Sequence, residues 1–260
     1  MIKLIASDID GTLVPDGGNE LNPELYDVIL KLRAKGIQFA AASGRQWLSI
    51  ESIFEPIKEK VFYLSDNGAY VGLHGRRLYI NPIERKTVMD MVRDVRNMEG
   101  LDVLICGPDV IYTETDNQEF LDWMVNGYRF HVKQVEDLTR VESEFIKISV
   151  YRKTDVEAHT RTLREKYRDR LKMTLAGDMW LDGMKPGINK GQAVKLLQDS
   201  LGIRPEETMA FGDQLNDIEM LKQAYYSFAV GNAREEVKAA ARFRTDTNVN
   251  DGVLKILKLL

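Results

Sequence analysis

Two acidic clusters, far apart along the chain, contain the residues best able to do chemistry. Asp8 and Asp10 directly follow a short apolar run at 4–6, and Asp213 and Asp217 follow a second strand-like run at 208–211. Like charges at such short spacing raise each other's pKa, so a proton, solvent or a hard divalent cation must relieve them. Either cluster alone would be read first as capping or solvated loop carboxylates. Together, four carboxylates at two strand ends favour a Mg2+ site.

The segments around these clusters predict the elements that position them. A short apolar run that ends abruptly in acidic residues or glycine is typical of a buried parallel strand. The run 37–42 ends at Ser43-Gly44-Arg45, and the run 61–64 leads into Asn67-Gly68. Ligands of open α/β sheets bind at the carboxyl ends of the strands. We therefore expect an α/β fold with a doubly wound parallel sheet.

Three local features of this part of the chain allow specific expectations. Asn22-Pro23 predicts the start of a helix that ends near Gly36. The stretch 15–18 is rich in turn-forming residues. Asn67-Gly68 is a strong hairpin signal, so a turn that only reverses the chain and a residue beside a ligand remain open alternatives.

The pattern changes in kind between residues 83 and 186. Helical segments and hairpins follow one another without long crossovers, which indicates an α+β module on an antiparallel sheet. A charged segment at 156–168 predicts one helix, whose arginines and lysines alternate with acidic residues and should form a solvated, self-paired face. The predicted domains are therefore 1–82 together with 187–260, and an inserted domain at 83–186.

Four motifs, taken in order, resemble those of a known family. They are Asp8-Ile9-Asp10-Gly11-Thr12-Leu13, Ser43-Gly44-Arg45, Lys190-Gly191 and Gly212-Asp213-Gln214-Leu215-Asn216-Asp217. These motifs resemble those of the haloacid dehalogenase (HAD) superfamily, and more narrowly its Cof-type phosphatases. The resemblance implies a Rossmann-like core, an inserted cap of the C2B type between the second and third motifs, and a phosphoric monoester hydrolase.

The resemblance also implies roles for the acidic residues. Asp8 would attack phosphorus and form an aspartyl-phosphate, and Asp10 would act as general acid and then general base. Thr12 would hold Asp10 in place. Mg2+ would be bound by Asp8, the backbone carbonyl of Asp10 and Asp213, with Asp217 as a further carboxylate.

Polar residues of the other motifs would bind the substrate. Ser43, Gly44 and Lys190 would grip the transferring phosphoryl group, because a hydroxyl and backbone N–H groups at a helix start suit a phosphate. Asn216 would steady the acidic loop. Arg45 and Asn67 would face the leaving portion of the substrate.

Two other functions remain as alternatives. A phosphomannomutase-like mutase shares the acidic pair and a similar cap, but it would need a second phosphate site, and the arginines of the inserted segment form no obvious cluster. A phosphosugar-binding sensor without turnover is the second alternative. Intact Asp8, Asp10, Lys190 and Asp213 favour an enzyme, and a carboxylate at Asp10 favours hydrolysis or transfer to a sugar hydroxyl over energy coupling.

Composition excludes several other classes. The chain has 260 residues and a net charge of −4, from 36 basic and 40 acidic side chains, so nothing draws it to nucleic acid or to acidic membranes. Its one cysteine, Cys106, can form no internal disulfide and reads as a buried hydrophobe. We find neither a signal peptide nor a membrane-spanning run. We expect a cytoplasmic enzyme that acts on small phosphorylated metabolites such as sugar phosphates; the oligomeric state is not predicted.

Overall fold

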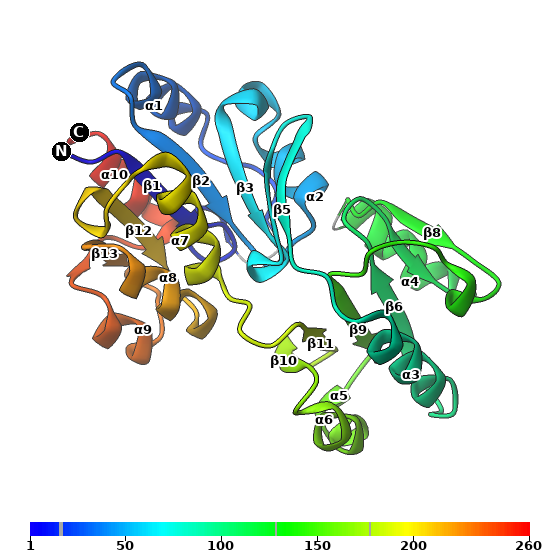
Figure 1. Ribbon diagram of the computed structural model, residues 1–260. Helices are drawn as coiled ribbons and strands as arrows, with labels where there is room; N and C mark the ends of the chain where they lie inside the picture. Colours follow the sequence, from blue (N-terminus) through cyan, green and yellow to red (C-terminus); the bar gives the residue numbers. More distant parts are fainter. Residues whose placement is uncertain (16–17, 128, 177) are drawn as a thin grey trace. The chain divides into compact units, whose positions relative to one another are not determined.

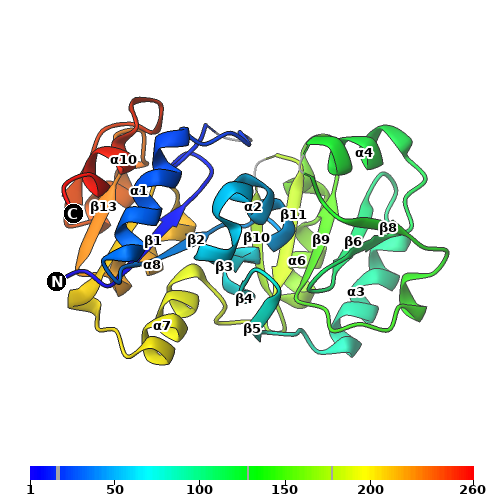
Figure 2. The same ribbon diagram turned by 90° about the horizontal axis from the view of Figure 1, so that it is seen from above.

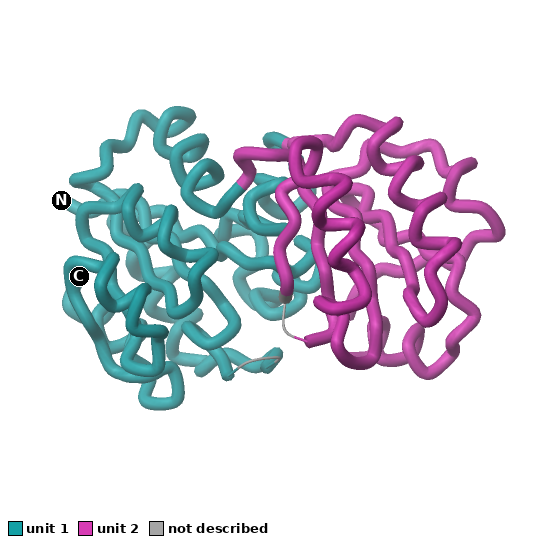
Figure 3. The backbone as a smooth tube through the Cα atoms, turned by 90° about the horizontal axis from the view of Figure 1, so that it is seen from below, with its two compact units in different colours: residues 1–79, 189–260 teal, residues 80–188 magenta. Residues whose placement is uncertain are grey.

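The chain folds into two compact units. The computed structural model describes residues 1–15, 18–127, 129–176 and 178–260; the predicted turn at 15–18 therefore lies partly outside the described residues. The first unit contains residues 1–79 and 189–260, and the second contains residues 80–188 (Figure 3). The chain thus leaves the first unit once and returns once.

The first unit is built on one sheet. Its strands are β1 (Leu4–Asp8), β2 (Gln38–Ala42), β3 (Val61–Ser65), β4 (Tyr70–Leu73), β5 (Arg76–Ile80), β12 (Thr208–Gly212), β13 (Tyr226–Ala229) and β14 (Phe243–Arg244). Their order is β14-β13-β12-β1-β2-β3-β4-β5 (Figure 1). Pairing is parallel from β14 to β3, and β4 pairs antiparallel with β3. Because β1 lies between β12 and β2, its carboxyl end is at the centre of the parallel part.

Helices cover both faces of this sheet. They are α1 (Pro23–Ala34), α2 (Trp47–Ile53), α7 (Lys190–Leu201), α8 (Ile218–Gln223), α9 (Glu235–Ala240) and α10 (Gly252–Leu257). Figure 2 shows β1 between α1 and α10 on one side and α7 on the other. All five residues of β1 are buried, as expected for a central parallel strand covered on both faces. The α/β fold class predicted from the sequence is confirmed.

The helix starts follow from local side chains. The side chain of Asn22 accepts a hydrogen bond from the backbone N–H of Glu24, and Pro23 occupies the first helical position of α1, as predicted. Asn189 caps α7 in the same way, accepting from the backbone N–H of Gln192 at 2.9 Å. This cap fixes the start of α7 at Lys190, the residue that the third motif singles out.

The second unit has its own sheet and its own core. Its strands are β6 (Asp102–Cys106), β7 (Ile111–Thr113), β8 (Val132–Gln134), β9 (Lys147–Tyr151), β10 (Lys172–Ala176) and β11 (Trp180–Met184), in the order β10-β11-β9-β6-β7-β8. Pairing is antiparallel, as predicted, except between β7 and β8. The helices are α3 (Arg85–Arg96), α4 (Gln118–Asp122), α5 (Val156–His159) and α6 (Arg161–Tyr167). Cys106 is buried in this unit and forms no disulfide.

One predicted helix is wrong. The charged segment at 156–168 forms two short helices, α5 and α6, that meet at Thr160. Thr160 is buried and outside helical geometry (φ −109°, ψ 9°), and its hydroxyl donates to the carbonyl of Val156 at 2.6 Å. A β-branched residue whose hydroxyl bonds the preceding turn favours such a break.

No helix among the described residues is both long and apolar enough to cross a membrane.

Candidate active site

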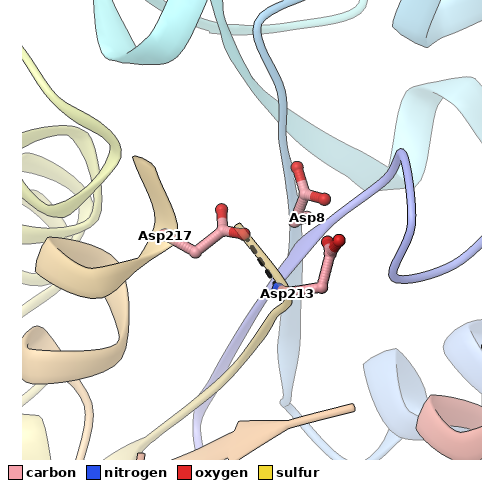
Figure 4. Close-up of side chains that lie close together, drawn as sticks. All are labelled: Asp8, Asp213 and Asp217. Carbon is pink, nitrogen blue, oxygen red and sulfur yellow. Dashed lines mark hydrogen bonds between the residues drawn. The ribbon is translucent and has the colours of Figure 1, made fainter. Parts of the chain in front are cut away.

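The carboxyl ends of β1 and β12 bring the two acidic clusters together. In this parallel pair Ser7 lies opposite Phe211, so the next residues on each strand reach the same edge of the sheet. Asp217 follows from the short turn Leu215–Asp217. Figure 4 shows Asp8, Asp213 and Asp217 gathered at one place, and one carboxylate oxygen from each lies within 4.8 Å of the others. All three residues are buried.

Lys190 is the cation of this cluster. Its side chain is only 1% exposed, and its Nζ contacts a carboxylate oxygen of Asp8 and one of Asp217, the latter at 2.6 Å. Burial alone would lower the pKa of this ammonium group, but attraction from Asp217 and Asp8 outweighs burial, so the pKa lies above its usual value. Lys190 therefore stays charged, and one positive charge faces three buried carboxyl groups.

Two carboxyl groups of the cluster, Asp8 and Asp213, have raised pKa values. Burial raises the pKa of Asp8 well above its usual value, and repulsion from Asp217 adds to this, while Lys190 opposes it. Burial also raises the pKa of Asp213, to about 6, against the hydrogen bond from Thr12. Both shifts mean that the site lacks positive charge when all three groups are ionised. A bound cation would supply that charge.

The donor set of the cluster fits a hard divalent cation. Carboxylate oxygens are the protein ligands that Mg2+ prefers, with water and phosphate oxygens completing the shell. All three carboxylates offer an oxygen to such a cation. One oxygen of Asp217 accepts from Lys190, and the other accepts the backbone N–H groups of Asp213 and Gln214 at 3.0 and 2.9 Å. Asp217 therefore braces the loop that carries Asp213.

Thr12 and Arg45 have partners other than those expected. The Thr12 hydroxyl donates to Asp213 at 2.7 Å, so it holds a carboxylate of the cluster, whereas the sequence predicted that it would hold Asp10. Arg45 holds Asp10 instead: its Nε donates to one carboxylate oxygen at 2.9 Å and its Nη2 to the other at 2.6 Å. That Arg45 faces the leaving portion of a substrate stays a prediction. The spacing of residues in the sequence could not show which neighbouring side chain Thr12 and Arg45 would each bond.

The Arg45 guanidinium is also tied to the loop before α1. Its Nη1 donates to the side chain of Asn19 at 2.6 Å, and its Nη2 donates to the carbonyl of Gly18 at 2.8 Å. The Arg45 side chain is 5% exposed and that of Asp10 is 30% exposed. Asp10 thus lies at the edge of the buried cluster, in a two-pronged ion pair of fixed geometry.

The remaining predicted residues form a second, connected group. The backbone carbonyl of Ser43 accepts the N–H of Asn67 at 2.9 Å, and the Asn67 side chain lies against Gly44. Asn216 donates its side-chain amide to the side-chain oxygen of Asn67 at 3.0 Å. Asn67 has φ 54° in the turn Asp66–Gly68 that joins antiparallel β3 and β4, so it reverses the chain and also lies at this edge. This bond ties the acidic loop to the turn that carries Asn67; that Asn216 steadies the acidic loop stays a prediction.

Sequence reasoning missed two residues that contact the acidic loops. The side chain of Gln214 donates to Asp213 at 3.2 Å, and the side chain of Asn232 donates to the backbone carbonyl of Gly11 at 2.7 Å. Both could have been found, since Gln214 lies inside the fourth motif and Asn232 follows the carboxyl end of β13. The signal was the same strand-end position that singled out Asp8.

Comparison with known proteins gives consistent relatives. The family model for haloacid dehalogenase-like hydrolases matches residues 5–257. The 5-amino-6-(5-phospho-D-ribitylamino)uracil phosphatase YbjI of Escherichia coli is 28% identical over 98% of this chain and 95% of its own length. The Bacillus subtilis phosphatase YcsE, named for the same compound, is 29% identical over 99% of this chain and 95% of its own length.

Solved structures agree in fold as well as in sequence. A crystal structure of a protein from Eubacterium rectale is 36% identical, spans 99% of this chain and 98% of its own, and superposes with a TM-score of 0.93. The HAD subclass IIB sugar phosphatase BT4131 is 25% identical over 98% of each chain, with a TM-score of 0.82. The family model spans nearly the whole chain and these relatives match it end to end, so the protein belongs to the haloacid dehalogenase-like hydrolase family, as a Cof-type phosphatase.

Proposed function

We propose that this protein is a Mg2+-dependent phosphatase that hydrolyses phosphate monoesters of sugars or sugar alcohols through an aspartyl-phosphate on Asp8. The observation that carries the proposal is the buried group of Asp8, Asp213, Asp217 and Lys190 at the carboxyl ends of β1 and β12. A nucleophile, a cation site and a fixed ammonium group at one place are what phosphoryl transfer needs, because catalysis there depends on position and charge.

The relatives support the substrate class. YbjI and YcsE are named for a substrate whose phosphate is on a ribityl chain, and BT4131 is named a sugar phosphatase. All three names describe an ester between phosphate and the hydroxyl of a polyol or sugar. An alkoxide is a poor leaving group, so a protein that cleaves such esters needs a general acid.

The first half of the reaction uses Asp8 and Asp10. An oxygen of Asp8 attacks phosphorus, and the bond between phosphorus and the ester oxygen breaks. Asp10 gives its proton to that oxygen, so the alcohol leaves neutral. Before this step Asp10 must be protonated and must give up part of its ion pair with Arg45, which holds the carboxylate form.

The second half uses the same residues in reverse. Asp10, now a carboxylate, takes a proton from water while the water oxygen attacks phosphorus. The bond between phosphorus and Asp8 breaks, which releases phosphate and regenerates Asp8. Arg45 holds the carboxylate form that this step requires, so the same ion pair that opposes the first half favours the second.

Other residues bind and orient. Asp8, the backbone carbonyl of Asp10 and Asp213 would hold Mg2+, which when bound neutralises charge on the phosphoryl oxygens. Lys190 keeps Asp8 in place and offsets its charge. Ser43 and Gly44 supply polar groups in the loop between β2 and α2. Asn67 with Asn216 forms the polar border of the same edge.

The test is phosphate release from a panel of sugar, sugar-alcohol and nucleotide phosphates, with Mg2+ or EDTA, for the wild type and Asp8→Asn. We expect metal-dependent release from sugar-alcohol and sugar phosphates, abolished by the substitution, because an amide oxygen is a far weaker nucleophile than a carboxylate. Trapping a phosphorylated chain with labelled substrate would identify the intermediate. Full activity of Asp8→Asn, or an inactive wild type across the panel, would contradict the proposal; net transfer of phosphate to a second sugar would favour a mutase.

A further inference from the structure

One short loop contacts both acidic loops of the site. It follows β13 and contains residues 230–234. The backbone N–H of Arg234 donates to the carbonyl of Asp213 at 3.1 Å, and the Asn232 side chain donates to the carbonyl of Gly11 at 2.7 Å. The loop therefore braces the two segments that carry the reacting groups, although its side chains do not belong to the acidic cluster.

The orientation of the Asn232 amide is determined by its two partners. Its oxygen accepts the backbone N–H of Asn248 at 3.0 Å, so its nitrogen is the atom that faces Gly11. Asn248 in turn donates its own side-chain amide to the carbonyl of Val14 at 3.2 Å. The two asparagines thus hold both ends of the turn from Gly11 to Val14.

This turn fixes the direction in which Asp10 points. It is closed by the N–H of Gly11 donating to the carbonyl of Val14 at 2.8 Å and by the N–H of Leu13 donating to the carbonyl of Ile9 at 2.8 Å. Gly11 has φ 79°, and a Cβ there would lie 2.3 Å from a carboxylate oxygen of Asp213, so the backbone packs directly on the cluster. Asp10 directly precedes Gly11, so a shift of the backbone of this turn would also shift the Cα atom of Asp10 and the carboxylate it carries.

From these contacts we infer that Asn232 is a positioning residue for proton transfer by Asp10. It holds the carbonyl of Gly11 and thereby the direction of the Asp10 side chain, without touching the substrate. The inference rests on the proposed function, because it assigns Asp10 the proton that the leaving oxygen receives. It goes beyond that function by assigning a role to a residue outside all four motifs.

A change of leaving group tests the inference. An alkoxide needs the proton from Asp10, whereas p-nitrophenolate leaves without one. In Asn232→Ala we expect kcat/KM for an alkyl phosphate, such as a sugar-alcohol phosphate, to fall by about 100-fold, within the range that general acid catalysis supplies. For p-nitrophenyl phosphate we expect kcat/KM to fall by about twofold, because that leaving group bypasses the acid. The comparison uses kcat/KM because it reports the steps through release of the leaving group, whereas kcat also contains the hydrolysis of the aspartyl-phosphate, in which Asp10 serves both substrates alike.

Two further variants complete the experiment. Asn250→Ala is the matched control, since it removes an exposed side-chain amide that donates to Asp246 nearby, and both substrates should keep wild-type rates. If circular dichroism shows that Asn232→Ala does not fold, the test is made with Asn232→Ser, for which we expect the same selectivity between the two substrates. Equal losses of kcat/KM on both substrates, or no loss on either, would overturn the inference. An inactive wild type would refute the proposed function on which it rests, and the two failures are therefore distinguishable.

Discussion

Charge balance at a few buried residues governs this site. Lys190 is almost fully buried and contacts Asp8 and Asp217, yet the cluster still carries an excess of carboxyl groups. Removing charges from water is costly unless they are paired, so the missing positive charge must come from protons or from a cation. In the absence of metal, protons take that place.

This gives a prediction for stability against pH. The pKa of Asp213 is raised from 3.8 to about 6, first by burial, so between these values the folded chain binds more protons than the unfolded chain. The free energy of unfolding of the metal-free protein should therefore decrease as pH rises from 4 to 6, by an amount on the order of 1 kcal/mol. Urea unfolding in EDTA at a series of pH values measures this.

Two additions make the pH experiment specific. Asp213→Asn should make this decrease smaller, because the variant has no carboxyl group there to titrate, while burial still raises the pKa of Asp8. Adding Mg2+ at pH 7.5 should raise the Tm of the wild type and have less effect on the variant. A wild type whose stability rises steadily from pH 4 to 6 in EDTA would contradict the assignment.

Arg45 gives a second prediction at this scale. Arg45→Lys keeps the positive charge but loses the two-pronged contact with Asp10 and the bonds to Asn19 and Gly18. We expect kcat on sugar phosphates to fall about tenfold, since the acid and base is no longer held in one direction. Arg33→Lys, whose guanidinium contacts Gln38 and a backbone carbonyl at the surface, is the control and should behave as wild type. Equal activity of both variants would show that the ion pair does not orient Asp10.

At the residue scale, sequence identified the acidic cluster but not all of its contacts. Asp8, Asp213 and Lys190 were predictable because strand ends and motif order bring them to one edge. The partner of Arg45 was not, because a long side chain can reach either a ligand or a neighbouring loop from the same backbone position. The hydroxyl of Thr12 likewise had two acidic residues within reach, and only the backbone turn at Gly11 decides for Asp213.

At the scale of elements, the contact between α7 and α8 sets the position of Lys190. Gly191, the second residue of α7, packs so closely on α8 that a Cβ there would lie 2.5 Å from the carbonyl oxygen of Glu219. Glycine at this helix position is therefore required by the approach of a neighbouring backbone. Since Lys190 is adjacent, any shift of α7 displaces its ammonium from Asp8 and Asp217.

Gly191→Ala should therefore lower both stability and activity. We expect a destabilisation of about 1–3 kcal/mol, from overpacking against backbone that cannot retreat freely. Phosphatase activity of the folded fraction should also fall, since Lys190 moves. Thermal unfolding and kcat, each measured for the variant and for Gln192→Ala at the exposed next position, check this. The control should be neutral or slightly stabilising, because alanine favours helix.

Element prediction from the sequence failed where tertiary contacts overrode local pattern. The helix α1 and the strands β1, β2 and β12 agree with their apolar patterns and caps. The segment after α4, Trp123–Gly127, continues as a π-helix, which no periodicity distinguishes from an α-helix. The break at Thr160 likewise depends on a buried hydroxyl, and the parallel pairing of β7 with β8 depends on the path of the chain between them.

At the scale of the whole molecule, each unit has a hydrophobic core of its own. The large cluster around β1 and β2 draws only on residues of the first unit, and the clusters around β9 and α3 draw only on the second. The second unit is also one continuous stretch of chain. Both properties are those of an independently folding domain.

We therefore predict that residues 80–188 fold when expressed alone. The isolated segment should unfold cooperatively on heating and give a dispersed NMR spectrum, because its sheet and helices bury their apolar faces against each other. The variant Val150→Asp, which places a charge in the core of this unit, serves as the unfolded reference. Similar, uncooperative melting of the wild-type segment and this variant would show that the unit needs the rest of the chain.

The position of β1 between β2 and β12 has a consequence for the fate of incomplete chains. β12 begins at Thr208, so any product that ends earlier leaves one side of β1 unpaired, with the buried apolar residues Leu4, Ile5 and Ala6 on an open sheet edge. Such an edge is a template for association with other chains. On this side β1 is thus protected only by a strand that comes much later in the chain, and a truncated product is a target for chaperones and proteases however well its second unit has folded.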